Sequence, residues 1–138
     1  MVSFFQFFVR GSIALCLSLC LLVTSCGNSL DGKRLTGIYI DDTVTVAQNL
    51  LNTINLAQDD ASRPEAEIES RALISEYTSR YRPQGQVNGL SSFTTMQTAL
   101  NSLAGHYASY ANRPLPDDLK ERLNKELKKA AASVVRGA

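Results

Sequence analysis

The chain has 138 residues, of which 44% are hydrophobic and 20% charged, and its formal net charge is +1 at pH 7. This length suits one domain with its own hydrophobic core and is too short for two domains of usual size. The near-neutral balance argues against a nucleic-acid partner, because such binding depends on neutralising phosphates with Lys and Arg.

Residues 1–25 are predicted to be a lipoprotein signal peptide. One positive charge, Arg10, precedes an almost wholly apolar run, Ile13–Val23. This run is shorter than the roughly 20 apolar residues that a membrane-spanning helix needs. The stretch Val23-Thr24-Ser25-Cys26 then resembles the lipobox of bacterial lipoproteins, in which the cysteine is acylated and becomes the first residue of the mature chain. Plain secretion with an odd thiol at Cys26 is the alternative.

Lipidation of Cys26 also accounts for the three cysteines of the chain. Cys16 and Cys20 lie in the segment expected to be removed, so the mature chain would have no free thiol. Its domain would then depend on the core alone rather than on disulfides. Two or three acyl chains would hold the protein on a membrane surface, since each buried methylene contributes roughly 0.8 kcal/mol.

Residues 26–41 are expected to form a flexible tether, and residues 42–138 the folded domain. From Asp42 onward, hydrophobic residues recur at spacings of three and four, which predicts amphipathic helices. Four helices are expected: from an Asp42 cap to about Leu56, from Pro64 to about Tyr81, from a Ser91 or Ser92 cap until Arg113 and Pro114 stop it, and from Pro116 to just before Gly137. With short connections and no alternating strand pattern, the fold class is all-α, an up-and-down four-helix bundle.

Residues typical of metal, haem or catalytic sites are scarce. The single histidine, His106, has Leu103 three positions before it, so no Glu-x-x-His pair exists, and a C-x-x-C-H haem motif is lacking. The acidic pairs Asp59-Asp60 and Asp117-Asp118 are interpreted as loop and helix-start residues. We therefore expect no cofactor, no metal and no enzymatic activity, with His106 at the boundary or surface of its helix.

The aromatic residues at helical spacing are expected mainly in the core. Arginine and aromatic residues nevertheless occur side by side near two predicted helix ends, as they do in protein interfaces. A partner-binding role is a hypothesis for these six residues, against the alternative of solvated helix ends: Arg80, Tyr81, Arg82, Tyr110, Arg113 and Pro114.

Three stretches resemble one known family. They are "SSFTTMQTALNSLAGHYASYANRPLPDDLKERLNKEL" (residues 91–127), "LISEYTSRYR" (residues 73–82) and "LTGIYIDDTVTVAQNL" (residues 35–50). Together they resemble the small lipoproteins that assist photosystem II assembly and repair on the lumenal side of the thylakoid membrane. The lipobox is consistent with this family, whose bacterial members are lipid-anchored.

The resemblance implies a four-helix bundle without cofactor or catalysis, monomeric when free and anchored to the lumenal side of the thylakoid membrane. Family members bind the large lumenal loop region of the chlorophyll-binding inner antenna subunit of immature or damaged photosystem II. They are thought to keep the extrinsic subunits off until the manganese cluster is assembled. Cys26 is the one family site that transfers by position. The alternative function is a periplasmic lipoprotein that binds a small ligand or another envelope protein.

Overall fold

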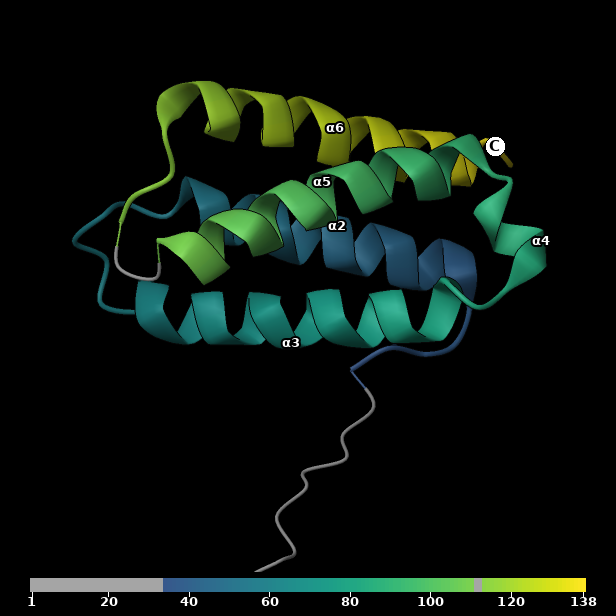
Figure 1. Cartoon of the computed structure of the whole chain (residues 1–138), viewed down its shortest axis with the longest axis horizontal. Coiled ribbons are helices and arrows are strands. Elements are labelled where there is room, and N and C mark those ends of the chain that lie inside the picture. The colour runs from purple at the N-terminus through teal and green to yellow at the C-terminus, as the bar shows by residue number, and fades with distance from the viewer. Residues whose placement is uncertain (1–33, 111–112) are drawn as a thin grey trace, which may run out of the picture. The chain divides into compact units, whose positions relative to one another are not determined.

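The computed structural model describes residues 34–110 and 113–138, and within these ranges the chain is helical with no strand (Figure 1). Its helices are α2 (Tyr39–Asn55), α3 (Arg63–Tyr81), α4 (Gly85–Asn88), α5 (Ser91–Ser109) and α6 (Asp117–Val135). The all-α prediction is confirmed, whereas the expected count of four helices overlooks α4, a single short turn of helix. Among the described helices, none combines the length and the apolar character needed to cross a bilayer.

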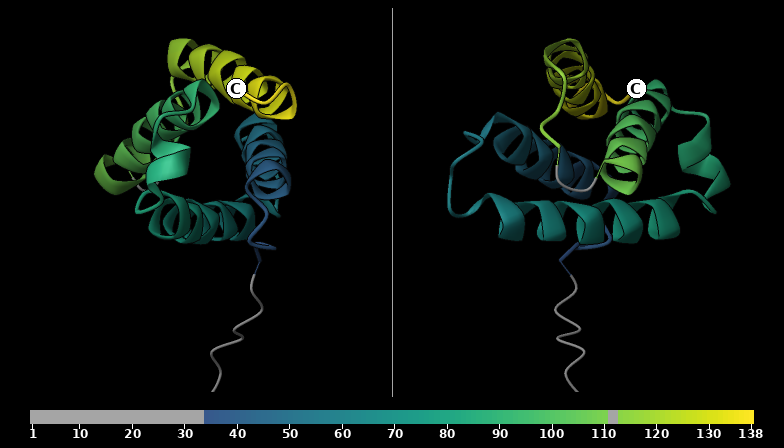
Figure 2. Two further views of the ribbon diagram at one scale, coloured as in Figure 1. Left: turned by 90° about the vertical axis from the view of Figure 1, so that its right-hand side faces the viewer. Right: turned by 60° about the vertical axis from the view of Figure 1, so that its left-hand side comes forward.

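The four long helices of the described residues form a ring around one core. Seen end on, the order around the ring is α2, α3, α5 and α6 (Figure 2). Successive long helices run in opposite directions, and α4 lies in the connection between α3 and α5 (Figure 1). Each long helix therefore has two antiparallel neighbours, and its apolar stripe faces the centre.

Along α5 and α6 the core consists mainly of hydrophobic residues three and four positions apart, as the sequence predicts. Along α5, Phe93, Met96, Leu100, Leu103 and Tyr107 are all buried, with Met96, Leu100 and Leu103 fully inaccessible to solvent. Burial of side chains of this size contributes roughly 1.5–3 kcal/mol each. On α6 the buried apolar residues are Leu123, Leu127, Ala130 and Val134.

The buried face of α3 differs from the predicted one. The spacing of apolar residues in this helix predicts a core face that includes Ile68, but Ile68 is 65% exposed, while Ser70 is fully buried. The Ser70 hydroxyl donates a hydrogen bond to Thr53 Oγ1 of α2 at 3.0 Å. A small side chain at this point lets the two helices approach, and the pairing of two hydroxyls meets the requirement that buried polar groups be bonded.

The folded part begins before residue 42, the boundary expected from the sequence. Leu35 is a core residue at 1% exposure, and α2 begins at Tyr39. Asp42 lies inside the first turn of α2 and is not its N-cap, because its carboxylate binds residues upstream of the helix. Residues 34–41 therefore belong to the domain, whereas the signal peptide, Cys26 and the tether up to residue 33 lie outside the described residues.

The serine cap expected for α5 is also wrong. Leu90 precedes the helix, and neither Ser91 nor Ser92 bonds a backbone N–H of its first turn. The Ser92 hydroxyl instead pairs with the Tyr39 hydroxyl at 2.9 Å, and the Ser91 hydroxyl lies 3.2 Å from that of Ser133. These serines join α5 to α2 and α6 instead of capping their own helix.

Candidate partner-binding surface

The two predicted partner-binding clusters lie at opposite ends of the bundle. Arg80, Tyr81 and Arg82 close α3, whereas Tyr110, Arg113 and Pro114 follow the end of α5. Because α3 and α5 are antiparallel neighbours, their C-terminal ends point in opposite directions (Figure 1). The structure therefore does not bring the six residues together, and each cluster has to be judged by itself.

The Tyr81 cluster is largely structural. Tyr81 is 1% exposed, and its hydroxyl donates a short hydrogen bond to the Asp42 carboxylate. Arg80 forms an ion pair with Glu76 one turn earlier, at 3.1 Å. The prediction that Tyr81 contributes to a binding surface is therefore wrong. Of the three side chains, Arg82 is the exposed one.

The Asp42 carboxylate is the centre of what we call the Asp42 cluster (Asp42, Thr36, Gly37 and Tyr81). Besides Tyr81, it accepts hydrogen bonds from the Thr36 N–H and hydroxyl, both at 2.7 Å, and from the Gly37 N–H at 2.9 Å. Burial raises the pKa of Asp42, but the hydrogen bonds from Tyr81, Thr36 and Gly37 outweigh it and hold the pKa below its usual value. The cluster fixes the segment before α2 against the end of α3.

The Tyr110 cluster, in contrast, is open to solvent. Tyr110 is 50% exposed, and the Arg113 guanidinium carbon lies 5.5 Å from its ring centroid, within the range of a cation–π contact. Arg113 and Pro114 are exposed. This predicted cluster therefore keeps the exposure that a docking surface requires.

His106 contacts two residues of the Tyr110 cluster (Tyr110, Arg113 and Pro114). It is 8% exposed, and its Nε2 lies 3.2 Å from the Arg113 carbonyl oxygen, so the tautomer protonated at Nε2 donates a hydrogen bond to it. Its ring centroid is 5.6 Å from that of Tyr110. The expectation that His106 lies at the surface or boundary of its helix is wrong, because the side chain is buried. Its hydrogen bond to Arg113 holds the connection to α6 against the end of α5.

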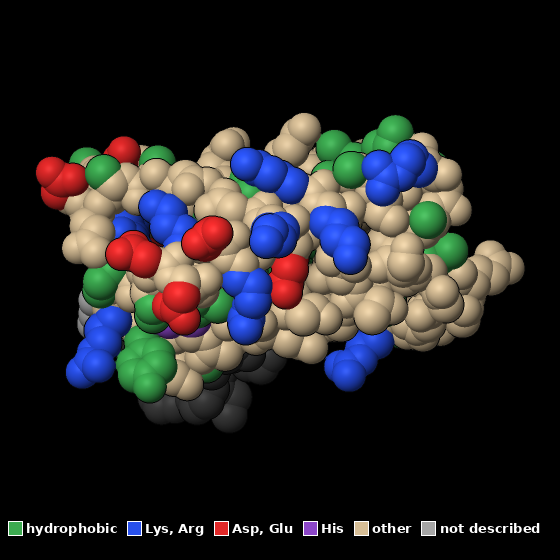
Figure 3. Space-filling model, turned by 90° about the horizontal axis from the view of Figure 1, so that it is seen from above, with side chains coloured by type: hydrophobic (Ala, Val, Ile, Leu, Met, Phe, Trp, Pro, Cys, Tyr) green, Lys and Arg blue, Asp and Glu red, His purple; other side chains and the backbone are tan. Residues whose placement is uncertain are grey.

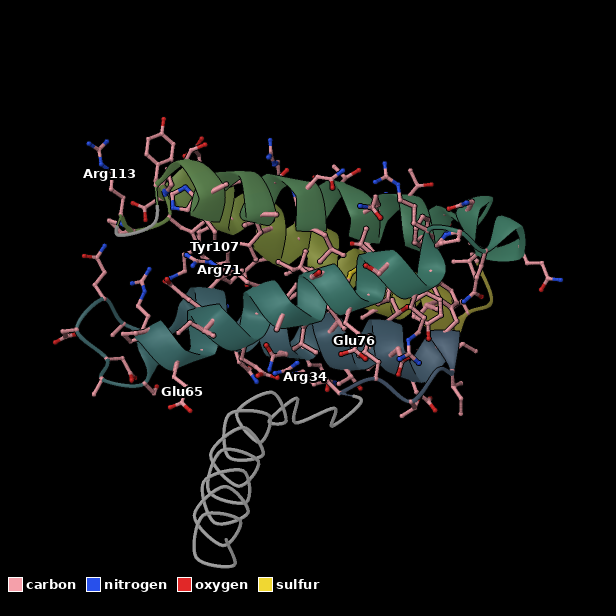
Figure 4. All side chains as sticks on the ribbon, turned by 60° about the horizontal axis from the view of Figure 1, so that its bottom comes forward. Arg34, Glu65, Arg71, Glu76, Tyr107 and Arg113 are labelled. Atoms are coloured by element: carbon pink, nitrogen blue, oxygen red, sulfur yellow. The ribbon has the colours of Figure 1, made fainter. Side chains whose placement is uncertain are left out.

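A second arginine–tyrosine pair lies between α3 and α5 at the same end of the bundle. The Arg71 guanidinium carbon of α3 lies 4.9 Å from the ring centroid of Tyr107 on α5. Figure 4 shows Arg71 and Tyr107 between the two helices, with Arg113 toward the same end. Sequence reasoning missed Arg71, whose one signal is that it precedes the apolar position Ile74 by a single turn.

A surface cleft of about 330 Å³ adjoins this pair, and we call it the α3–α5 cleft. Its lining residues are Arg71, Ile74, Ser75, Ala104, Tyr107 and Ala108. Most of these side chains are apolar or small, and Arg71 supplies the one charge among them. The cleft is thus an apolar hollow with a single cation at its edge.

Tyr107 forms one wall of the α3–α5 cleft. Its side chain is 6% exposed, and its hydroxyl is buried without a hydrogen-bond partner in the described part of the chain. Burial raises the pKa of Tyr107 to about 12, and the nearby Glu67 carboxylate contributes in the same direction. The phenol is therefore neutral at physiological pH and keeps an unused donor.

Two neighbouring clefts are lined by side chains of both charges. One, of about 300 Å³, is lined by Asp59, Asp60 and Glu67 together with Arg63 and Arg113. The other, of about 340 Å³, lies where the α2–α3 and α5–α6 connections meet and includes one acidic and two basic side chains. In the described ranges no group of three His, Cys, Asp or Glu side chains is placed to hold a metal.

The outer face of α6 is basic over much of its length. Figure 3 shows Lys and Arg side chains spread over this side of the molecule, with Asp and Glu gathered toward one end. The exposed charged residues on α6 are Asp117, Asp118, Glu121, Arg122, Lys125, Lys128 and Lys129. The acidic start and basic remainder suit the helix dipole, so this pattern has a local explanation.

Known structures share this arrangement of helices. The solution structure of Psb27 from cyanobacterial photosystem II matches with a TM-score of 0.75 at 50% identity, covering 81% of this chain and 97% of that one. The class is therefore a small helical domain with the Psb27 fold. A family model described as Photosystem II Pbs27 matches residues 6–134, and the chain belongs to this family.

Curated relatives match over nearly the whole chain. The Photosystem II lipoprotein Psb27 of Synechocystis sp. is 46% identical over 136 residues, which cover 99% of both chains. The Photosystem II assembly factor lipoprotein Psb27 of Thermosynechococcus vestitus is 46% identical over 125 residues, covering 91% of this chain and 92% of the relative. The resemblance to this family that the sequence suggested is confirmed.

Proposed function

We propose that the chain is a membrane-tethered factor for photosystem II assembly and repair, acting on the lumenal side of the thylakoid membrane. The observation that carries this proposal is the match to the Synechocystis lipoprotein, which extends over 99% of both chains. A match of that extent includes the helices, the connections between them and the surfaces they expose. The fold fits the same proposal, since its interior is filled by side chains and its clefts are open and small.

The proposed action is occupation of a protein surface. The bundle binds the large lumenal loop region of the chlorophyll-binding inner antenna subunit in immature or damaged photosystem II. While bound, it keeps the extrinsic subunits off until the manganese cluster is assembled. Steric exclusion of this kind needs a rigid body and a specific contact, and it needs no chemical step by the chain itself.

The bundle is proposed to act as an up-and-down four-helix bundle in which α4 elaborates one connection. A filled core of antiparallel helices moves little on binding, so the binding surface is formed before the partner arrives. Preorganisation of this kind lowers the ordering cost of association. We propose that the free protein is a monomer.

The proposed anchor is Cys26, acylated after removal of residues 1–25. Eight residues, 26–33, separate the lipid from the first described residue, Arg34. A chain of eight residues spans at most roughly 26–29 Å. The bundle is thereby confined to a thin layer above the membrane, where a modest interface suffices because the effective concentration of a membrane complex is high.

The proposed contact surface is the end of the bundle where α5 meets its connection to α6. Tyr110, Arg113 and Pro114 are exposed there. Arg71 of α3 contacts Tyr107, which precedes Tyr110 by three residues on α5. Arg and Tyr are the residue types that most often dominate binding energy in interfaces. The opposite end, where Tyr81 is buried against Asp42, offers Arg82 alone from the predicted set.

An affinity isolation from thylakoids tests the proposal. A tagged copy of the full chain, expressed in cells arrested before assembly of the manganese cluster, should recover the inner antenna subunit and its partners. A Cys26→Ser copy serves as the control for tethering and should recover less of the same complex. Recovery of no photosystem II subunit by the full chain would contradict the proposal, and copurification of a small ligand instead would favour the periplasmic alternative.

A further inference from the structure

We infer that the α3–α5 cleft is an acceptor site for one acidic side chain, Asp or Glu, of the partner protein, with Arg71 as the group that receives its carboxylate. The inference rests on the proposed function, because it names the chemistry of one contact in that interface. It concerns residues on α3 and the inner side of α5, which the sequence did not single out as a binding site.

The first argument is the charge state of Arg71. Its neighbours on the same helix are neutralised, since Arg63 pairs with Glu67 at 2.9 Å and Arg80 with Glu76 at 3.1 Å. Glu67 lies one turn before Arg71 but is engaged by Arg63. Arg71 is exposed and forms no ion pair with any described carboxylate, so it presents an uncompensated charge at the edge of the cleft.

The second argument is that the guanidinium is already positioned. Its contact with the Tyr107 ring, at 4.9 Å to the centroid, uses the side chain without consuming its hydrogen-bond donors. Because Arg presents a planar set of donors, those N–H groups remain available for a bidentate bond to a carboxylate. Less rotamer freedom is then lost on binding than for an unsupported arginine.

The third argument is the apolar lining of the cleft. Ile74, Ala104 and Ala108 surround the approach to Arg71, and no described carboxylate is among the lining residues. A partner side chain that fills the cleft would displace water from these apolar walls, and a charge pair is stronger in such surroundings than on a polar surface. A volume of about 330 Å³ accommodates one side chain and the backbone beside it.

The test compares Arg71 with Arg82, which is also exposed and also lacks an ion pair among the described residues, but lies at the other end of α3. Binding of the full acylated chain to detergent-solubilised photosystem II from assembly-arrested cells is titrated for the wild type, Arg71→Gln and Arg82→Gln. Loss of a central interface arginine typically weakens binding roughly ten- to hundredfold. We expect a loss of that size for Arg71→Gln, and a change below about twofold for Arg82→Gln.

A second measurement identifies the ligand group directly. The Arg71→Lys variant places an amine at the cleft, and a carbodiimide joins an amine to a carboxylate that touches it. We expect a zero-length crosslink from residue 71 to an Asp or Glu of a photosystem II subunit, and none from the Arg82→Lys control. If the Arg71→Lys variant remains bound to photosystem II but gives no crosslink from residue 71, the inference is overturned.

The remaining outcomes separate the inference from the proposed function. If the wild type and Arg71→Gln bind photosystem II with equal affinity, and urea unfolding shows that the variant is as stable as the wild type, the acceptor site is overturned and the proposed function stays intact. No binding by the wild type overturns both. The unacylated Cys26→Ser chain is also tested on phosphatidylglycerol vesicles. If it binds them, and if adding Arg71→Gln to it abolishes that binding, the cleft receives a lipid headgroup and the inference as stated is overturned.

Discussion

Replacing Asp42 with Asn tests whether the Asp42 cluster holds the segment before α2 in place. The carboxylate faces donors on both of its oxygens. Oδ1 accepts from the Thr36 N–H and hydroxyl, and Oδ2 accepts from the Gly37 N–H and the Tyr81 hydroxyl. An asparagine in either orientation therefore directs its amide hydrogens against a backbone N–H that cannot rotate away.

The size of the effect follows from the bonds that are lost. A hydrogen bond to a charged group contributes roughly 1.5–3 kcal/mol, and a buried donor left unpaired costs roughly 1–3 kcal/mol. Because Asn keeps one of the two oxygens, we expect the free energy of unfolding of Asp42→Asn to fall by about 2–4 kcal/mol at pH 7. With a urea dependence of about 1–3 kcal/mol per molar, the midpoint should fall by on the order of 1 M.

The pH dependence of this difference has a definite sign. The pKa of Asp42 in the folded protein is below its usual 3.8, so its contribution to stability is fully present above the unfolded pKa. That contribution is lost as pH falls through the lower, folded pKa. The gap between wild type and Asp42→Asn should therefore be constant from pH 7 to about 5 and should narrow below about pH 4.

Urea unfolding of the chain that starts at residue 27, followed by helical circular dichroism, measures the global effect. Amide hydrogen exchange measures the local one, since Thr36 and Gly37 should lose protection in Asp42→Asn before α5 does. Tyr81→Phe is the matched variant, because it removes one of the four bonds and leaves no backbone donor opposed; it should cost about 1.5–3 kcal/mol, less than Asp42→Asn. Equal midpoints for wild type and Asp42→Asn, with both amides still protected, would refute the reasoning.

Three further predictions concern stability and attachment. Tyr77→Phe should lower the free energy of unfolding by about 1 kcal/mol, because the Tyr77 hydroxyl bonds Thr43 in the core at 2.8 Å. Tyr107→Phe should not lower it, because the Tyr107 hydroxyl has no partner among the described residues. A larger loss for Tyr107→Phe than for Tyr77→Phe would contradict this difference. Gly105→Ala should stabilise the protein by about 0.5–1 kcal/mol, because nothing lies near the added Cβ in α5. Gly37→Ala should destabilise it, since Gly37 has φ +91° and Arg80 Nη1 lies 3.2 Å from the added Cβ. A higher melting temperature for Gly37→Ala than for Gly105→Ala would contradict both predictions. Cys26→Ser should leave the helical signal unchanged and release the protein from membranes in a salt wash, and retention of that variant would show that protein contacts hold it there.

Local periodicity was sufficient to predict α5 and α6. In both helices apolar residues follow steps of three and four and define one stripe, most of which is buried. The exceptions are Tyr110, which is exposed, and Leu119 and Ala131, which are half-buried. The helix after Pro64 was also placed within one residue of its start, since proline is tolerated in a first turn. These features depend on neighbours along the chain, which the sequence displays directly.

The buried face of α3 was not predictable in the same way. Ile68 and Ser70 are two residues apart and lie on different faces, and hydrophobicity alone assigns the core to Ile68. The structure buries Ser70 because it faces Thr53 of α2 at a point where the helices are close. Which face of a weakly patterned helix is buried depends on the shape of the neighbouring helix, and that information is not local.

The candidate site shows the same division between local and distant information. Tyr81 and Arg80 are neighbours in sequence, which suggested a joint surface, yet Asp42 from another helix buries the tyrosine. Arg71 and Tyr107 are far apart in sequence, and only the antiparallel packing of α3 on α5 makes them a pair. A charged residue next to an apolar position is common on helix edges, so Arg71 carried no distinguishing signal before the fold was known.

The most direct test of the central claim is crosslinking mass spectrometry on the photosystem II complex isolated with the full chain. The account predicts crosslinks between Lys120, which lines a cleft with Pro114 at the exposed end of the bundle, and the lumenal loops of the inner antenna subunit. Lys125, Lys128 and Lys129, farther along α6, provide an internal control and should give fewer links to that subunit. A complex that yields no link from the bundle to any lumenal loop, or a chain that is absent from the complex, would contradict the account.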